Sequence, residues 1–343
     1  MDTKIITNPS EQDIDMLARA LRKGELVSIP TETVYGLGAN GLDPEAMDKI
    51  YAAKGRPSDN PLILHIPNSE SIKPLVTEVS STAQALMDSF WPGPLTITLP
   101  KSDLVPDRAT GGLPRVALRC PDHDGCRVLL QRAGIPIAAP SANISGRPSP
   151  TTAQDVYNDM NGRISYILDA GPCTIGVEST VVEVHDDKVI ILRPGGITKA
   201  QLETVVSNVE YDTALVNAET KPKAPGMKYT HYAPDAPMTV VVGTPESVAN
   251  TFNKLSKGIE GPIGCLVSHE TYELIKDDSR FMCHCFGHHG DALALGHDFY
   301  KSLLHFNENH VTLILAEGVN DDGFGVAIMN RMEKASGHHI IYK

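Results

Sequence analysis

The sequence predicts a two-domain α/β protein. The chain has 343 residues, and single domains usually run to about 100–200 residues. Short apolar runs that end at proline or glycine alternate with amphipathic stretches, and a weakly patterned segment from about Thr198 to Pro237 divides the chain. Alternating strand and helix patterns are typical of open α/β sheets. We therefore expect a first domain at 1–198, a linker or lid at 199–237 and a smaller α/β domain at 238–343.

Composition excludes several classes of protein. Hydrophobic residues make up 41% of the chain and charged residues 21%, which is ordinary for a globular protein. No apolar run approaches the roughly 18 residues that cross a bilayer, and the start has no signal or transit pattern. We therefore expect a cytoplasmic protein without membrane association. The net charge of −12 argues against non-specific nucleic-acid binding over the whole surface, although it leaves room for a local basic cleft.

The first half of the chain alternates predicted helices and strands. Ser10 is suited to cap a helix that ends near Gly24, and Asp43-Pro44 starts a second helix, with proline at its first position. A third helix spans about Ser81 to Phe90. Further helices are expected at 126–133 and 152–159, and strands at 61–66, 95–99, 114–120, 135–139, 164–168, 179–184 and 189–192.

The stretch from Leu26 to Gly38 delivers polar side chains to the end of a strand. Its apolar run stops at Pro30, and Thr31, Glu32 and Thr33 follow before a glycine pair. Open α/β sheets bind ligands at such strand ends. The glycines also fit the pattern G-x-G-x-x-G, but no helix follows at once, so we expect them to provide a turn and close packing rather than a dinucleotide site.

Two loops carry groups suited to phosphate. Lys54 and Arg56 stand one residue apart at a predicted helix end, where they either bind an anion or simply complement the helix C-terminus. The second loop, Pro140 to Ser149, offers hydroxyls, an amide and an arginine, or is merely a polar turn. His65 and Glu32 are candidates for a general base or an ammonium partner, while a lone histidine in a strand is more often structural.

The second domain is expected to hold a small parallel sheet, with strands at 240–242, 263–267 and 311–316 and helices at 291–306 and 326–335. All six cysteines are read as reduced thiols. Cys283, His284 and Cys285, with His288 and His289, have zinc-ligand types in an atypical spacing, so they form either a metal site or an incidental cluster. The aromatic run from Met227 to Tyr232 indicates that the linker is ordered against a surface.

Taken together, several motifs resemble the two-domain YrdC-type threonylcarbamoyl-adenylate synthases. They cover nearly the whole chain in order: Pro30-Thr31-Glu32-Thr33-Val34-Tyr35-Gly36-Leu37, Lys54-x-Arg56, Trp91-Pro92-Gly93-Pro94-Leu95-Thr96, Ser141-x-Asn143, Glu178-Ser179-Thr180-Val181, Leu192-Arg193-Pro194-Gly195, Pro225–Pro234 and Gly323–Arg331. The resemblance implies a twisted, open, mixed sheet in the first domain and a Rossmann-like second domain. It also implies an enzyme that makes L-threonylcarbamoyl-AMP from L-threonine, bicarbonate or CO2 and ATP, with Mg²⁺, for t6A modification of tRNAs that read ANN codons.

The resemblance also implies the site residues. A catalytic tetrad would comprise Lys54, Arg56, Ser141 and Asn143. ATP would contact Arg56, Asn60, Arg115, Ser141, Ser149, Arg193 and Tyr232, with Tyr232 closing over the cleft from the linker. Threonine would contact Thr33, His65, Arg119, Ala139 and Ser179, and Mg²⁺ would be held mainly through the ATP phosphates. Downstream t6A transferase machinery and weak contact with RNA complete the expected partners.

Two other functions compete with this interpretation. An RNA-binding module is disfavoured by the acidic net charge and by the absence of interleaved aromatic residues in the sequence. An O-carbamoyltransferase that forms a carbamoyl adenylate shares the expected fold. The sequence lacks the acylphosphatase-like and zinc-finger segments of that larger enzyme.

Overall fold

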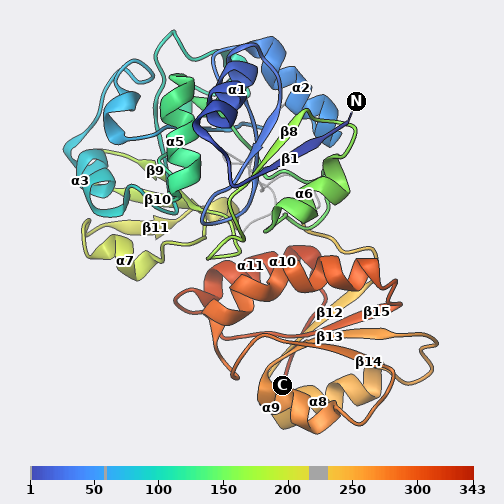
Figure 1. Ribbon diagram of the computed structural model, residues 1–343. Helices are drawn as coiled ribbons and strands as arrows, with labels where there is room; N and C mark the ends of the chain where they lie inside the picture. The colour runs from blue at the N-terminus through green and yellow to red at the C-terminus, as the bar shows by residue number, and fades with distance from the viewer. Residues whose placement is uncertain (1, 58–59, 216–230) are drawn as a thin grey trace. The chain divides into compact units, whose positions relative to one another are not determined.

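Two β-sheets organise the chain, which we describe from a computed structural model (Figure 1). The structure describes residues 2–57, 60–215 and 231–343. Described residues up to 215, except 146–148 and 175–177, form the first compact unit. Those two short segments belong with residues 231–343 in the second unit.

The first unit contains a mixed sheet, as expected. Among the described residues its strands follow the order β1-β8-β2-β3-β7-β4-β6-β5-β9-β10-β11. Pairs such as β1 with β8 and β4 with β6 are parallel, whereas β2 with β3 and β5 with β6 are antiparallel. The strands are β1 (Lys4–Thr7), β2 (Val27–Ile29), β3 (Gly36–Asn40), β4 (Ile63–His65), β5 (Leu95–Pro100), β6 (Arg115–Arg119), β7 (Ile137–Ala138), β8 (Tyr166–Asp169), β9 (Thr180–Val184), β10 (Val189–Arg193) and β11 (Val209–Tyr211).

The glycine pair after the first buried strand lies in a strand, so the expected turn at these glycines was wrong. β2 and β3 form an antiparallel hairpin, and the chain reverses through Pro30 to Tyr35 instead. A Cβ on Gly38 would lie 2.8 Å from the Val27 carbonyl oxygen, and one on Gly36 would lie 3.1 Å from the Ala139 Cβ. Close packing between strands therefore accounts for both glycines, and this part of the expectation was right. Because the pattern does not open into a helix, it lacks the context of a dinucleotide fingerprint.

Helices cover both faces of this sheet. Apolar residues of α1 (Glu11–Arg22) and α5 (Asp124–Ala133) pack on Val27, Ile29 and Ile137 at one face. The opposite face packs against α2 (Pro44–Lys54), α3 (Ser81–Phe90), α6 (Ala153–Met160) and α7 (Lys199–Glu203). A short α4 (Asp107–Thr110) and the 3-10 turns η1 (Ser69–Ile72) and η2 (Thr213–Leu215) complete the described elements of this unit.

Part of the segment predicted as linker belongs to the first unit. α7 and β11 lie between residues 199 and 211, and β11 pairs with β10 at the edge of the sheet. Leu202, Val206 and Val209 are buried in the main core, which anchors both elements. Their apolar residues are too few for a clear periodic pattern, and for this reason the sequence alone did not reveal them.

The second unit holds a parallel sheet in the order β14-β13-β15-β12-β16 among its described residues. Its strands are β12 (Met238–Val242), β13 (Ile263–Val267), β14 (Phe281–Cys285), β15 (Leu313–Glu317) and β16 (Ile340–Tyr342). Its helices are α8 (Pro245–Leu255), α9 (His269–Ile275), α10 (Ala292–Glu308) and α11 (Gly325–Ala335). Figure 1 shows α8 and α9 on one face of this sheet and α10 and α11 on the other, which confirms the expected Rossmann-like layering.

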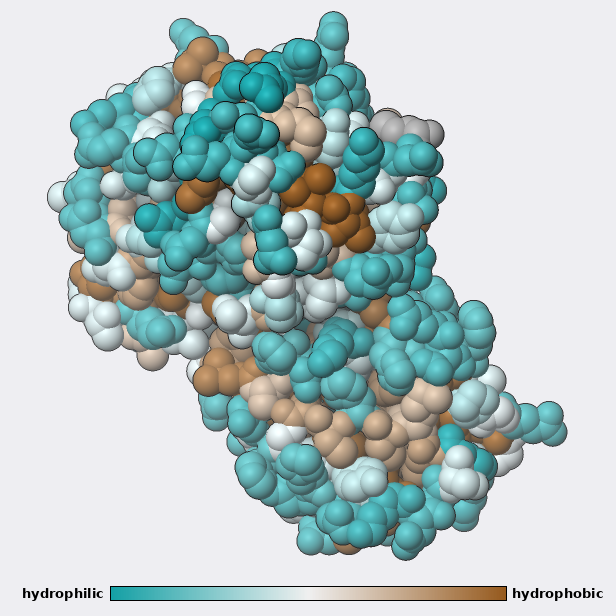
Figure 2. All heavy atoms as spheres, viewed as in Figure 1, coloured by the Kyte–Doolittle hydropathy of each residue, from teal (hydrophilic) through white to brown (hydrophobic). Residues whose placement is uncertain are grey.

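Surface composition agrees with the sequence. On the face drawn in Figure 2, hydrophilic residues dominate and hydrophobic ones form small groups. Within the described ranges, no helix combines the length and the apolar composition needed to span a membrane.

Candidate active site

Helices cover one face of the large sheet over some of its strands but not in the same way over others. The registers β4 with β7 and β4 with β6 place Ile137, His65 and Arg119 on the same face. Over β2 and β7 this face is covered by α1 and α5. Over β4, β6, β9 and β10 it carries a small cluster made of strand residues, namely Ile63, Ala117, Val181 and Leu192. We call this second region the floor.

Arg119 lies at one end of the floor and is fixed by three groups. Its NH1 donates to the Thr33 hydroxyl at 2.8 Å, its Nε to the Gly93 carbonyl at 3.4 Å, and its NH2 forms an ion pair with Glu32 at 2.7 Å. Thr33 in turn lies 2.9 Å from the hydroxyl of Thr31. The arginine side chain is only 4% exposed. A guanidinium has five N–H donors. Here Nε and NH1 each donate one hydrogen bond, whereas NH2 lies against Glu32 as an ion pair and has no hydrogen-bond partner among the described residues.

His65 lies beside Arg119 in the parallel register of β4 and β6. Burial, reinforced by the positive charge of Arg119, lowers the pKa of His65 to about 3. Its Nδ1 lies 3.2 Å from the Ile63 carbonyl oxygen, which can only accept, so Nδ1 carries the proton. The imidazole is therefore neutral at physiological pH. The lowered pKa disfavours His65 as a general base, while its predicted contact with threonine stays a prediction.

Ser179 and Arg193 form a second buried group on the neighbouring strands. Arg193 donates to the Ser179 carbonyl through Nε at 3.1 Å and NH2 at 3.0 Å, and NH2 also lies 3.1 Å from the Ser179 hydroxyl. The Ser179 hydroxyl lies 2.8 Å from that of Thr96. Thr96 precedes Ile97, which pairs with Leu118, so it stands opposite Arg119. Ser179, predicted to contact threonine, and Arg193, predicted to contact ATP, are thereby joined by hydrogen bonds.

Sequence reasoning assigned no role to Thr96 or Glu178. Glu178 is buried, and one of its carboxylate oxygens accepts from the Ser149 hydroxyl at 2.7 Å. Both residues stand in the motifs that carry the family resemblance, and Glu178 is next to the assigned Ser179. Their partners, Ser179 for Thr96 and Ser149 for Glu178, are far away in the chain, and such side-chain pairing is not readable from one sequence.

Lys54 fixes the loop from Pro140 to Ser149 by hydrogen bonds to its backbone. Its Nζ donates to the Ser141 carbonyl at 2.5 Å and to the Asn143 carbonyl at 2.6 Å. Burial, and then the charge of Arg56, lower the pKa of Lys54 well below its usual range. The loop is also attached to the β2–β3 hairpin, because Ala142 N donates to Tyr35 O at 2.9 Å. Lys54, Ser141 and Asn143 therefore come together as predicted from the sequence.

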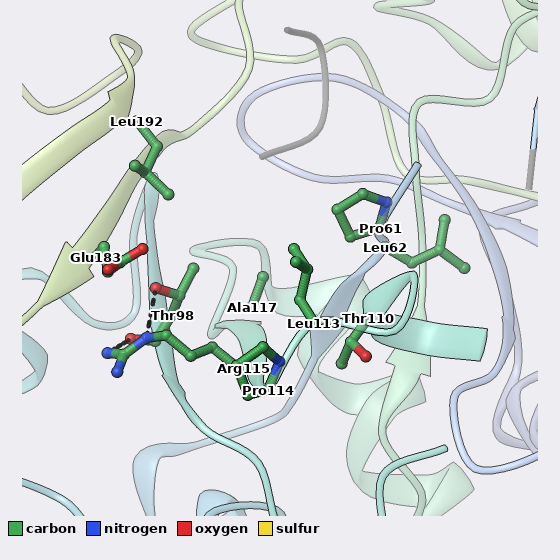
Figure 3. Close-up of a pocket in the computed structure, with 10 residues that line it drawn as sticks. All are labelled: Pro61, Leu62, Thr98, Thr110, Leu113, Pro114, Arg115, Ala117, Glu183 and Leu192. Carbon is green, nitrogen blue, oxygen red and sulfur yellow. Dashed lines mark hydrogen bonds between the residues drawn. The ribbon is translucent and has the colours of Figure 1, made fainter. Parts of the chain in front are cut away.

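A cavity of 240 Å³ lies over the other end of the floor. Figure 3 shows its lining residues: Pro61, Leu62, Thr98, Thr110, Leu113, Pro114, Arg115, Ala117, Glu183 and Leu192. Arg115 reaches along its edge and donates to the Thr98 and Val184 carbonyls at 2.7 Å each. The lining combines aliphatic side chains with two hydroxyls, one carboxylate and the Arg115 cation, which makes a site for a partly apolar group.

The structure separates some of the predicted residues. Arg115 and Arg119 share a face, as expected, but four residues of strand place their Cα atoms roughly 13 Å apart. Ala139 packs its side chain among the helix-covered residues, and its N donates to the Ile63 carbonyl. Asn60 is buried next to the cavity residue Pro61, and Arg56 NH2 donates to the Pro61 carbonyl at 3.3 Å.

Tyr232 lies in the second unit with a left-handed backbone, at φ 66°. It is buried, and its ring centroid lies 5.3 Å from that of Tyr300. The following residue, Ala233, donates its N–H to the Gly146 carbonyl at 2.8 Å. Residues 216–230, which include Met227 to Thr230, lie outside the described residues. The predicted contact of Tyr232 with ATP stays a prediction.

The cysteines and histidines of the second unit do not converge on a metal position. Within the described residues no group of three or more His, Cys, Asp or Glu side chains could hold a metal ion. Along β14 successive side chains alternate between faces. Cys283 and Cys285 pack with α8 and α9, while His284 pairs with Asp298 of α10. Cys283 and Cys285 therefore lie on the opposite face of the sheet from His284.

Comparisons with known proteins cover the whole chain. Residues 19–195 match a family model described as "Telomere recombination", and residues 197–337 match one described as "Threonylcarbamoyl-AMP synthase, C-terminal domain". A threonylcarbamoyl-AMP synthase of Bacillus subtilis is 45% identical over 97% of this chain and 95% of its own length. One of Schizosaccharomyces pombe is 38% identical over 97% of this chain and 91% of its own.

A solved structure is similar in fold along the full length. The crystal structure of Pyrococcus abyssi Sua5 complexed with L-threonine matches with a TM-score of 0.92 and 40% identity, and it covers 100% of both chains. The site described above therefore lies in a chain whose relatives share both of its sheets.

Proposed function

Because the chain belongs to the threonylcarbamoyl-AMP synthase family and is an enzyme, we propose that it makes L-threonylcarbamoyl-AMP from L-threonine, bicarbonate or CO2 and ATP, with release of pyrophosphate. The membership is carried by matches at 38–45% identity over nearly the whole chain. Two features support the substrates that we propose: Arg119 at one end of the floor and the cavity at the other.

The observation that carries the proposal is the orientation of Arg119. Glu32, Thr33 and Gly93 hold its guanidinium, and its NH2 group has no hydrogen-bond partner among the described residues. A fixed guanidinium with unused N–H donors suits a carboxylate, which an amino acid supplies. The Thr33 hydroxyl contacts Arg119, and Thr96, which stands opposite Arg119 on β5, has its hydroxyl 2.8 Å from that of Ser179. These hydroxyls give the pocket the donors and acceptors that a threonine hydroxyl requires.

The nucleotide belongs at the opposite end of the floor. Adenine is flat and partly apolar, and the cavity beside Leu113, Leu192 and Arg115 offers such surroundings. The roughly 13 Å between the Cα atoms of Arg115 and Arg119 leaves room for ribose and phosphates between base and amino acid. Arg56, Ser141 and Ser149 are then proposed to contact the phosphate chain, as the resemblance implies.

The proposed chemistry needs positioning and charge rather than a protein nucleophile. The threonine amine adds to CO2 and loses one proton, which gives a carbamate. A carbamate oxygen then attacks the α-phosphorus, the bond from this phosphorus to the α,β-bridging oxygen breaks, and pyrophosphate leaves. His65 is neutral, so Arg119 is the charged group of this pair. The threonine carboxylate therefore pairs with the Arg119 guanidinium and not with the imidazole. Lys54 acts on the loop from Ser141 to Asn143, which it holds by two carbonyls, and thereby positions the phosphate-facing groups.

The chemistry of the site is compatible with Mg²⁺ held mainly by ATP. Mg²⁺ commonly takes its ligands from substrate phosphates, waters and one or two protein oxygens, so it needs no dedicated carboxylate cage. The Ser141 side chain and the Asn143 amide are oxygen donors on the loop held by Lys54. When bound, Mg²⁺ would neutralise phosphate charge.

We further propose that the product serves t6A formation in tRNA. Threonylcarbamoyl-AMP is a mixed anhydride whose acyl group must pass to an acceptor amine before water destroys it. A transferase that acts on adenosine in tRNA is the consumer that the family resemblance implies, and transient contact with such machinery or with RNA follows. The proposal places the reaction in the cytoplasm.

Pyrophosphate release tests the proposal directly. The full chain is incubated with ATP and Mg²⁺, and threonine or bicarbonate is omitted in turn, with D-threonine as a matched control. Release should require both substrates, and a nucleotide product with the mass of threonylcarbamoyl-AMP should accumulate. Release that persists without either substrate would refute the proposal, and turnover with carbamoyl phosphate in their place would instead indicate an O-carbamoyltransferase. RNA binding without any ATP turnover would indicate an RNA-binding module.

A further inference from the structure

Two cysteines of the second unit face each other across neighbouring strands. Cys265 of β13 and Cys283 of β14 are direct partners in the parallel register. Parallel neighbours lie about 4.8 Å apart, which falls inside the Cα separation of about 4.4–6.8 Å that a disulfide spans. Both side chains point to the face covered by α8 and α9. β14 is the edge strand of this sheet, so it can shift toward β13 without disturbing a further neighbour.

The two thiols differ in reactivity. Cys265 is fully buried, and burial raises its pKa well above the usual range. Cys283 is partly exposed, and its hydrogen bond with Cys265 lowers its pKa. A partly exposed thiol of lowered pKa beside a second thiol is the arrangement of an oxidisable pair. Burial instead raises the pKa of Cys126 and Cys173, which makes them inert by comparison.

Cys285, the third cysteine on this face of the sheet, serves as an internal control for Cys283. Cys285 pairs with Val267 rather than with a cysteine, and burial raises its pKa. It shares a face with Cys283, two residues away along the same strand. Its Cα lies about 8 Å from that of Cys265, from a strand spacing of about 4.8 Å and two residues of about 3.3 Å rise each, which is beyond the reach of a disulfide without backbone movement.

We propose that Cys265 and Cys283 form a reversible disulfide when the protein meets hydrogen peroxide. The Cys283 thiolate attacks one peroxide oxygen, the O–O bond breaks, and with one proton the products are Cys283 sulfenic acid and water. The Cys265 sulfur then attacks the Cys283 sulfur, the S–O bond breaks, and the thiol proton leaves with hydroxide as a second water. The sulfurs lose two electrons, and peroxide gains them. This inference is independent of the proposed reaction.

Intact-mass and peptide mapping of the full chain test this site. After treatment with peroxide, we expect a product 2 Da lighter than the reduced chain. Free thiols are then blocked with N-ethylmaleimide. Only four of the six cysteines should be alkylated after unfolding. One linked peptide pair should contain Cys265 and Cys283, and dithiothreitol should restore both thiols. The Cys283→Ser variant should give at least tenfold less of this product, and the matched Cys285→Ser variant should give as much as the parent.

Several results would overturn the proposal. One is a gain of 16 or 32 Da at Cys283 while Cys265 remains alkylatable. A Cys283–Cys285 linkage, an undiminished yield in Cys283→Ser, or no oxidation of the parent would each do the same. Far-UV circular dichroism of both variants checks that they keep the secondary structure of the parent, and linkage mapping of the parent tests the site even if a variant misfolds.

Discussion

Replacing Arg119 with lysine tests the amino-acid end of the site. The change keeps a positive charge but removes the planar fork that Glu32, Thr33 and Gly93 orient. An ammonium at this position can supply one contact to a substrate carboxylate in place of two. A hydrogen bond to a charged group contributes about 1.5–3 kcal/mol, and about 1.4 kcal/mol is a factor of ten. We therefore expect the KM for threonine to rise about 10- to 150-fold.

The same substitution has a calculable effect on stability. Arg119→Lys loses at least one of the donors to the Thr33 hydroxyl and the Gly93 carbonyl, and one hydrogen bond from a charged group contributes about 1.5–3 kcal/mol. The charge opposite Glu32 is retained, so the larger penalty of a buried unpaired carboxylate is avoided. A loss of about 2 kcal/mol leaves a domain of ordinary stability folded. Urea denaturation should confirm this before kinetics are compared.

The assay is pyrophosphate release with threonine and ATP varied separately. Only the KM for threonine should move, because the proposed nucleotide end lies roughly 13 Å away along β6. Arg132→Lys is the matched control, since that arginine is partly exposed and pairs with Asp15 outside the floor. If the variant raises the KM for ATP and leaves that for threonine unchanged, the orientation argument is wrong. An equal rise for both substrates would count against it as well.

Three further predictions address the cavity, a buried base and the second unit. Leu113→Trp should fill the cavity and raise the KM for ATP at least tenfold while sparing that for threonine, and titration with a non-hydrolysable ATP analogue would check binding itself. His65 has a pKa of about 3 when folded and about 6.5 when unfolded, so the unfolded chain binds the extra proton between these values and stability falls as pH falls below 6.5. His65→Gln should lack this slope, which is about 1.4 kcal/mol per pH unit. The free energies of unfolding of the parent and the variant, measured with urea, should therefore converge by about 2 kcal/mol between pH 7 and pH 5. Parallel pH dependences of the two proteins would contradict the assignment. The buried Glu317 carboxylate accepts from Ser268 N and Ser268 Oγ and lies 2.7 Å from His289 Nδ1. Glu317→Gln should therefore lower the free energy of protection of β13 and β15 against hydrogen exchange by about 2–3 kcal/mol, and kcat should be unchanged.

Much of the fold was readable from the sequence because its local signals are strong. The helix from Ser81 to Phe90 was placed at its observed bounds, with the Ser80 hydroxyl capping it. The helix after Asp43-Pro44 likewise ends at Lys54, followed by a left-handed Gly55. Caps and breakers act over a few residues, so one sequence suffices to place them.

Elements defined by distant partners were missed. β1 and β16 are short strands that gain their hydrogen bonds from β8 and β12, far away in the chain. β3 was read as a turn because glycines suggest flexibility, whereas here the close approach of Val27 and Ala139 requires them. Short strands with few apolar residues have no periodic signal of their own.

The candidate site was predictable by type and less so by contact. The motifs pointed to Arg119, Thr33, Ser179 and Lys54, and the structure brings the first two into contact. That Lys54 would be buried under carbonyls of a loop nearly ninety residues later, rather than exposed to solvent, depends on packing that no local pattern encodes. The roles of these residues in binding ATP and threonine remain predictions.

The order of strands in the large sheet has a consequence for synthesis on the ribosome. β1 is made first, yet its partner β8 begins at residue 166, and the far edge is closed by β11 at residues 209–211. Pairing between such distant segments is slow, since the intervening loop must close before contacts compensate for the lost entropy. The N-terminal strand therefore emerges from the ribosome long before it can pair. At about 5–20 residues per second, the nascent chain waits for roughly ten seconds or more with β1 unpaired.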